Sequence, residues 1–163
     1  MVRLAAALVA AALTAASGAL AQEEARLSVD DIIAAMGDAG LPVNESQVSS
    51  DSAFISSEIG GLVFAVFGFN CAGEPTACTD YMFSSYFVVD EPVSLETIND
   101  FNERAVAGRA YVDDDGDANI EVYFAATDAS AASVVSTYFD VWAEVFFDFA
   151  RTIGYIEDET PDA

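Results

Sequence analysis

The chain has 163 residues, with 28 acidic side chains, five arginines, and no lysine or histidine. This length fits one domain, and the formal charge of -23 excludes the basic surface that nucleic acids and anionic lipids need. The lack of histidine also excludes histidine catalysis and metal sites with histidine ligands. We therefore expect no nucleic-acid partner.

The first 21 residues have the pattern of an export signal. Arg3 supplies a short positive region, and the apolar run 4–13 has the length of a signal-peptide core. Residues 19–21 match the small-x-small motif of signal peptidase, so we expect cleavage between Ala21 and Gln22. The apolar run is shorter than the roughly 20 residues of a spanning helix. The pattern predicts a periplasmic or secreted protein that has no membrane association after cleavage.

The mature chain is predicted to be one domain over residues 22–155, followed by an acidic disordered tail over 156–163. Its 28 carboxylates face four arginines, which makes the mature charge -24. Two interpretations fit so acidic a surface, namely adaptation to a salty medium and recognition of a cationic partner.

Two shorter segments have the apolar spacing of helices, with start and stop signals. In the first, over residues 28–39, Ser28 and Asp31 resemble a capping box, and Gly40 ends the pattern. The second begins at Ser94 and carries its apolar residues on one side until Gly108 ends it.

A long third helix is predicted over residues 131–153, because its apolar residues recur at steps of three and four. This stripe is expected to pack on a sheet. Phe147 lies about 120° around the helix from the stripe, a position typical of a partner or dimer contact. Phe147 and the nearby Trp142 are therefore the candidate partner-binding residues. The stripe itself consists of Val135, Phe139, Trp142, Phe146, Phe149 and Ile153.

Between the helices, six segments have the composition of strands. They are residues 47–49, 53–58, 62–70, 81–89, 110–113 and 119–126. The segment 62–70 is apolar in both phases of the strand repeat, which predicts a central strand covered on both faces. The order helix, four strands, helix, two strands, helix indicates an α+β domain with a mainly antiparallel sheet.

Cys71 and Cys78 are the only cysteines, and an exported chain places both in an oxidising compartment. Gly73 and Pro75 between them suit a turn, so we expect a disulfide at the base of a hairpin loop. A redox-active pair is the alternative, but it usually needs closer spacing and a nearby positive charge.

An acidic cluster around Gly116 is the sharpest local motif. An EF-hand loop that starts at Asp113 requires glycine at its sixth position, where this chain has Ala118. Aspartate and glycine together predict a β-hairpin turn. The alternative is a weak cation site formed by Asp113, Asp115 and Asp117.

No catalytic signature is present. The chain lacks a Gly-x-Ser-x-Gly elbow and a glycine-rich phosphate loop. Paired carboxylates can hydrolyse glycosides, but a chain with 28 acids contains such pairs without that function. We expect a non-enzymatic protein without a cofactor, and keep a carboxylate hydrolase as a third hypothesis.

The segment 94–116 resembles the YbjN family of bacterial proteins. That family has a helix of the form Ile-Asn-x-aromatic-Asn, followed by a basic-Ala-Tyr strand and an Asp-rich turn. The cysteine pair between aromatic strands also resembles the exported members, and the similarity extends over roughly residues 28–153. The matching positions are Ile98, Asn99, Phe101, Asn102, Arg109, Ala110, Tyr111 and Gly116.

The resemblance implies a fold similar to that of type III secretion chaperones, which are often dimers, and the role of a sensory transduction regulator. It implies no catalytic residue. Asn99 and Asn102 share one side of a helix, where they either bridge backbone groups of neighbouring strands or bind a ligand.

Two functional hypotheses follow. The first is a non-enzymatic exported module, chaperone-like or regulatory, that binds another protein or a second copy of itself. The alternative is a periplasmic protein that binds a cation or small ligand at the acidic hairpin of residues 113–117.

Overall fold

The computed structural model of the chain describes residues 24–127 and 129–157. The predicted signal peptide, its cleavage site between Ala21 and Gln22, and tail residues 158–163 lie outside the described residues. Within the described ranges, no helix combines the length and hydropathy needed to cross a membrane.

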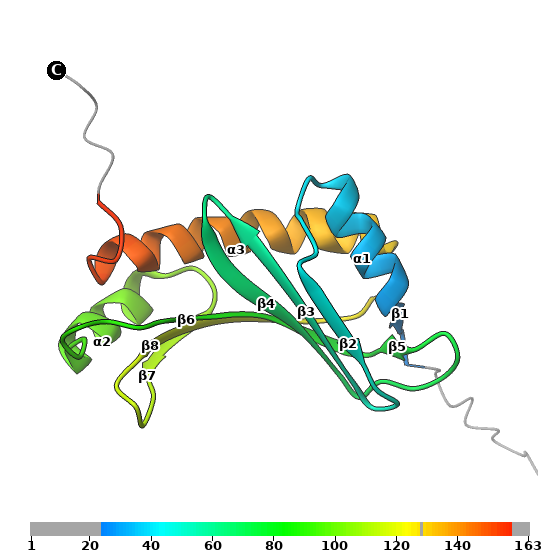
Figure 1. The fold of residues 1–163 in the computed structure, drawn as a ribbon, viewed down its shortest axis with the longest axis horizontal. Helices are drawn as coiled ribbons and strands as arrows, with labels where there is room; N and C mark the ends of the chain where they lie inside the picture. Colours follow the sequence, from blue (N-terminus) through cyan, green and yellow to red (C-terminus); the bar gives the residue numbers. More distant parts are fainter. Residues whose placement is uncertain (1–23, 128, 158–163) are drawn as a thin grey trace, which may run out of the picture.

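The described elements confirm the predicted α+β class and the predicted order of helices and larger strands. A curved antiparallel sheet has the strand order β2-β3-β4-β6-β8-β7, and β1 pairs with β5 in a separate small sheet (Figure 1). The elements are β1 Leu27–Ser28, α1 Val29–Asp38, β2 Glu45–Val48, β3 Ser52–Ile59, β4 Leu62–Phe69, β5 Ala77–Cys78, β6 Asp80–Phe87, α2 Leu95–Arg104, β7 Arg109–Val112, β8 Ala118–Ala125 and α3 Ala131–Thr152.

The core lies between α3 and one face of the sheet. Trp142 of α3 contacts Phe64 of β4 and Phe83 of β6 at ring-centroid distances of 5.7 and 5.6 Å. It also stacks on Phe146 at 4.7 Å. The predicted packing of the α3 stripe on the sheet is confirmed. Trp142 is fully buried, however, so its proposed role in partner binding is wrong.

Phe147 is half-buried rather than free. Gly60 and Gly61 form the β3–β4 turn, and both adopt the positive φ that a type I′ turn requires. A Cβ atom at Gly60 would lie 3.1 Å from Cζ of Phe147, so the ring covers this turn. The ring therefore lies partly against this turn, and the partner contact expected at Phe147 stays a prediction.

β4 differs from the prediction in a way that matters for function. Only one of its faces is buried, and Val63 on the other face is 59% exposed. Burial alternates along β3 and β6 as well. The described helices lie on one side of the sheet, and Figure 1 shows α3 crossing that side. We call the opposite side the open face.

The ends of the shorter helices also differ from the prediction. Ser28 is the N-cap of α1, but its side chain makes no capping hydrogen bond, and its backbone pairs with Ala77 of β5. Ser94 does cap α2 by accepting from the Thr97 N–H at 3.1 Å. α2 ends at Arg104, four residues before Gly108. Gly108 instead allows close strand pairing, since a Cβ there would lie 2.9 Å from a carbonyl oxygen of β8.

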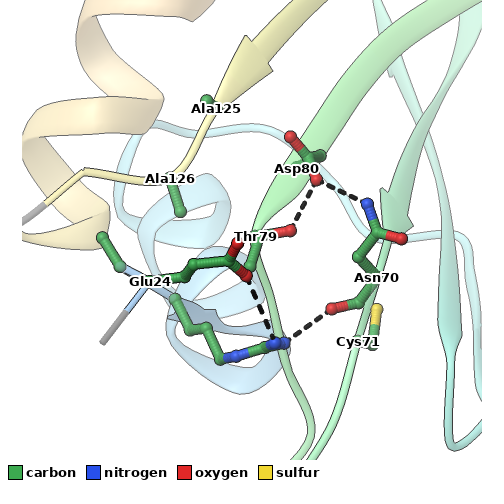
Figure 2. A pocket seen from close by; sticks show the side chains of 9 residues that line it. Glu24, Asn70, Cys71, Thr79, Asp80, Ala125 and Ala126 are labelled. Carbon is green, nitrogen blue, oxygen red and sulfur yellow. Dashed lines mark hydrogen bonds and ion pairs between the residues drawn. The ribbon is translucent and has the colours of Figure 1, made fainter. Parts of the chain in front are cut away.

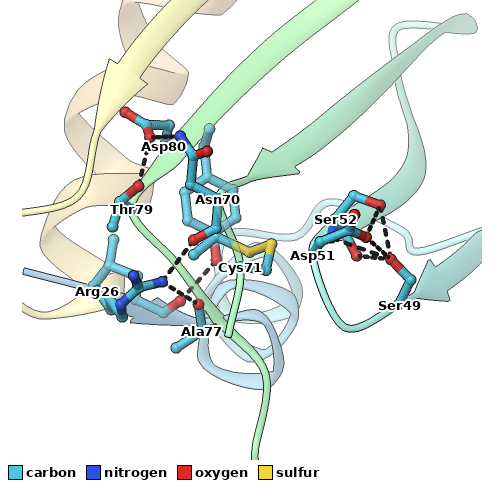
Figure 3. The surroundings of a disulfide bond; sticks show 12 residues. Arg26, Ser49, Asp51, Ser52, Asn70, Cys71, Ala77, Thr79 and Asp80 are labelled. Carbon is cyan, nitrogen blue, oxygen red and sulfur yellow. Dashed lines mark hydrogen bonds between the residues drawn. A yellow bond between two sulfur atoms is a disulfide. The ribbon is translucent and has the colours of Figure 1, made fainter. Parts of the chain in front are cut away.

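The predicted disulfide between Cys71 and Cys78 is confirmed, and it joins the ends of the loop that separates β4 from β6 (Figure 3). Both cysteines are buried. Arg26 donates to the carbonyls of Asn70 and Ala77, which directly precede them, at 2.6 and 3.3 Å. The bond thus fastens β5, and through it β1, to the main sheet.

Candidate functional site

The open face carries a row of large apolar side chains across the sheet. Strand register places Phe54, Phe67, Met82 and Tyr123 opposite one another on β3, β4, β6 and β8. Phe54 and Phe67 lie 5.5 Å apart, and Phe67 stacks on Phe69 at 6.3 Å. An apolar, uncovered sheet face of this kind is typical of a protein interaction surface.

Exposed apolar side chains extend this row along the strands. On the same face, Val63 is 59% exposed and Tyr86 is 66% exposed. A shallow hollow of about 330 Å³ lies beside β2, with Gln47, Phe54 and Phe67 in its lining. The face therefore offers broad contact area rather than a closed ligand cavity.

A second hollow, of about 440 Å³, lies near the far end of the face, between Met82, Tyr123 and the polar cluster of β7 and β8. In that cluster, Arg109 pairs with Glu121 at 2.6 Å, and the Tyr111 hydroxyl donates to Glu121 at 2.8 Å. The Arg109 guanidinium also lies over the Tyr111 ring at 5.0 Å. Arg109 and Tyr111 of the family motif thus form one edge of the open face.

The carboxylate of Glu121 influences the protonation of both Arg109 and Tyr111. The hydrogen bond and charge of Glu121 raise the pKa of Arg109, so its guanidinium stays charged. Burial, followed by the hydrogen bond to Glu121, raises the pKa of Tyr111, so its hydroxyl stays protonated and can donate. The cluster is neutralised internally and stabilises β7.

Asn102 fixes β7 from the side. Its Oδ1 accepts from the Ala110 N–H at 2.9 Å, and its Nδ2 donates to the Ala110 carbonyl at 3.0 Å. The amide therefore occupies the edge of β7 as a neighbouring strand would. The predicted bridging role is correct for Asn102 but not for Asn99, which is exposed and has no hydrogen bond to any described residue.

The substitution Asn102→Ala is expected to lower the free energy of unfolding by about 2 kcal/mol, because Ala110 loses partners for its N–H and its carbonyl. Urea unfolding followed by circular dichroism measures the change. Asn99→Ala is the matched control and is expected to change stability by less than about 0.5 kcal/mol. Equal losses from both substitutions would contradict the bridging role.

At the end of the sheet, a polar cluster surrounds Asp80 beside a wide hollow of about 730 Å³ (Figure 2). Asp80 accepts from Thr79 at 2.5 Å, from Asn70 at 2.8 Å and from the Tyr123 hydroxyl. Hydrogen bonds from Thr79, Tyr123 and Asn70 hold the pKa of Asp80 below its ordinary value. Three donors already use this carboxylate, so the cluster is better explained as structural than as a free ligand site.

The acidic segment forms the predicted hairpin turn between β7 and β8. Asp113 Oδ1 accepts from the N–H groups of Asp115 and Asp117 at 3.1 and 2.9 Å, and its Oδ2 accepts from Asn119 at 2.9 Å. The side-chain bond from Asn119 and the turn N–H groups lower the pKa of Asp113. Across the part of the chain that the structure describes, no three acidic or cysteine side chains converge as metal ligands would. The geometry gives the proposed site at Asp113, Asp115 and Asp117 no support.

Several residues of the open face were missed from the sequence. Phe67 lies in the segment 62–70, whose apolar pattern predicts cover on both faces, and Phe54 and Tyr123 lie in predicted strands to which no binding role was assigned. The available signal was the number of helices, since three helices cannot easily cover both faces of a six-stranded sheet.

The fold and its surface define a class, an α+β domain in which the described helices cover one side of the antiparallel sheet. The sequence matches the YbjN family, described as "Putative bacterial sensory transduction regulator", over residues 28–154. The chain therefore belongs to the YbjN family. No curated protein matches it. The family supports a regulatory or binding role in general, and the disulfide fits an exported protein.

Proposed function

We propose that this protein is a non-enzymatic, exported binding module that recognises another protein through its open face. The observation that carries this proposal is the uncovered apolar row formed by Phe54, Phe67, Met82 and Tyr123. Burying such side chains against a partner is worth about 25 cal/mol for each Å² of apolar surface removed from water. A regulatory role fits the family description.

The absence of enzyme chemistry is part of the same proposal. The sequence has no histidine, and two acidic side chains of the open face are engaged by other residues. Glu121 is paired with Arg109, and Asp80 accepts three hydrogen bonds. Neither carboxylate has the free, poised arrangement of a general base.

The test truncates exposed apolar side chains of the open face in the double variant Val63→Ser/Tyr86→Ser. The oxidised protein is immobilised, and proteins retained from periplasmic extract are quantified by mass spectrometry. Retention of a specific partner should fall at least about ten-fold, because interface energy is concentrated in a few apolar and aromatic contacts. Sedimentation of the unchanged protein, compared with that of the variant, shows whether the partner is a second copy of the chain.

The matched control is Leu95→Ser/Val106→Ser, which removes side chains that are 70% and 85% exposed on α2 and in the loop after it, outside the strands of the open face. This control should retain the partner as the unchanged protein does. Equal losses from both double variants would reject the open face as the binding surface. A chain that retains nothing specific and stays monomeric would reject the proposal as a whole.

A further inference from the structure

The two edge strands of the main sheet, β7 and β2, differ in whether their outer backbone groups are hydrogen-bonded. At one edge, the side chain of Asn102 bonds both the N–H and the carbonyl of Ala110, so β7 is closed to further pairing there. At the other edge, no strand of the described chain pairs with the outer side of β2. All four residues of β2 are exposed. An edge of this kind can receive an added strand.

The open face continues directly to this edge. Gln47 of β2 lies opposite Phe54 of β3, which lies opposite Phe67 of β4. The hollow of about 330 Å³ beside these residues also touches Ser49 and Phe69. A strand added to β2 would direct every second side chain toward the same face as these aromatic rings.

The acidic residues near β2 determine which kind of added strand would be attracted to this edge. Glu45 lies on β2 and Glu58 on β3, Asp51 lies in the turn between them, and residues 45–69 contain no basic side chain. A second copy would bring another Glu45 and another strongly negative chain to this edge, which like-charge repulsion disfavours. A basic segment would be attracted, and its arginines could also lie over the faces of the aromatic rings.

We propose that β2 accepts an extended segment of a partner protein, rich in arginine and apolar residues, as an added strand of the sheet. This inference rests on the proposed function of the open face and names the chemistry of its partner. Main-chain hydrogen bonds to β2 provide the attachment, and the acidic and aromatic side chains provide the selectivity.

Isothermal titration calorimetry with three short peptides tests this proposal on the full mature, oxidised protein. The first peptide alternates arginine and valine, the second replaces arginine by glutamate, and the third is the arginine peptide with alternate backbone amides N-methylated. Only the first should bind, and its affinity should fall at least about ten-fold between low and physiological salt. Equal binding of the N-methylated peptide would overturn strand addition.

Two charge-reversal variants locate the site. Glu45→Lys/Glu58→Lys should weaken the arginine peptide at least about ten-fold, because both carboxylates lie on strands at the edge. Asp100→Lys/Glu103→Lys makes the same charge change on exposed positions of α2 and should leave the affinity nearly unchanged. Equal weakening by both variants would show that only the overall charge acts, and would overturn the proposal.

The failure of this inference is distinguishable from the failure of the proposed function. If no arginine peptide binds but Val63→Ser/Tyr86→Ser still abolishes partner retention, the added basic strand is rejected and the open face stands. If the peptide binds at β2 but that double variant retains the partner, the open face is rejected as the partner site.

Discussion

Replacing Gly68 by alanine is expected to lower the free energy of unfolding by about 3 kcal/mol, because the new methyl group has no room. A Cβ at this position would lie 2.8 Å from the Cys78 sulfur and 3.2 Å from both Ala53 Cβ and Tyr81 Cε1. These neighbours cannot easily move. The sulfur belongs to the disulfide, and the Tyr81 hydroxyl donates to the Leu27 carbonyl at 2.8 Å. Urea unfolding followed by circular dichroism measures the loss.

A double-mutant cycle tests whether overlap with the Cys78 sulfur causes this loss of stability. In the background Cys71→Ala/Cys78→Ala, the sulfur is gone, and Gly68→Ala should cost only about 1 kcal/mol. Gly37→Ala is the control, since nothing lies within 4 Å of a Cβ at that helical position. It should leave stability unchanged or raise it by up to about 1 kcal/mol. If Gly68→Ala lowers the free energy of unfolding equally with and without the Cys78 sulfur, overlap with that sulfur is not the cause.

Removing the disulfide through Cys71→Ala/Cys78→Ala is expected to lower the free energy of unfolding by about 2.5 kcal/mol, the chain-entropy value for so short a loop. The structural effect should be local. β5 and the strand it pairs with, β1, depend on this connection to the main sheet. Hydrogen exchange should therefore accelerate at Leu27 and Ala77 more than in β8.

A reductant provides the control for this prediction. Dithiothreitol should destabilise the unchanged protein by a similar amount once its disulfide opens, and should have no effect on the variant that lacks both cysteines. Uniform acceleration of exchange across the whole sheet would contradict a local role for the bond. Undiminished stability of the variant would show that the bond adds nothing to the fold.

Much of the architecture could be predicted from local patterns. The α3 stripe follows from the 3.6-residue period, and the β3–β4 turn follows from Gly60-Gly61. The hairpin around Gly116 follows from turn chemistry. Each of these patterns is fixed within a few residues, so tertiary context is not needed to recognise it.

Features fixed by long-range packing could not be predicted in the same way. β1 and β5 each have two residues, too few for any periodicity, and they exist because the disulfide loop meets the start of α1. Helical spacing also does not reveal that the Gly60 turn lies against part of the Phe147 ring. α2 ends before its predicted stop signal at Gly108, because Ala105 adopts an extended backbone, and Asn102 in the last turn bonds to β7.

The candidate site was missed for a different physical reason. The apolar pattern of β4 was interpreted as burial on both faces within one chain. A strand that is buried on one side by its own helices and on the other by a partner would carry the same residues. The side chain of Phe67 therefore predicts a covered face correctly only if the cover comes from outside the chain.

Trp142 is the only tryptophan of the sequence, and it is enclosed by Phe64, Phe83 and Phe146 on the helix side of the sheet. Its fluorescence emission should lie at short wavelength while the core is intact and shift to the red when the core opens to water. Ligands that dock on the open face meet Tyr86 and Tyr123 instead, on the far side of the sheet. Tryptophan emission thus monitors folding alone, and it allows any change in binding by a variant to be separated from loss of its structure.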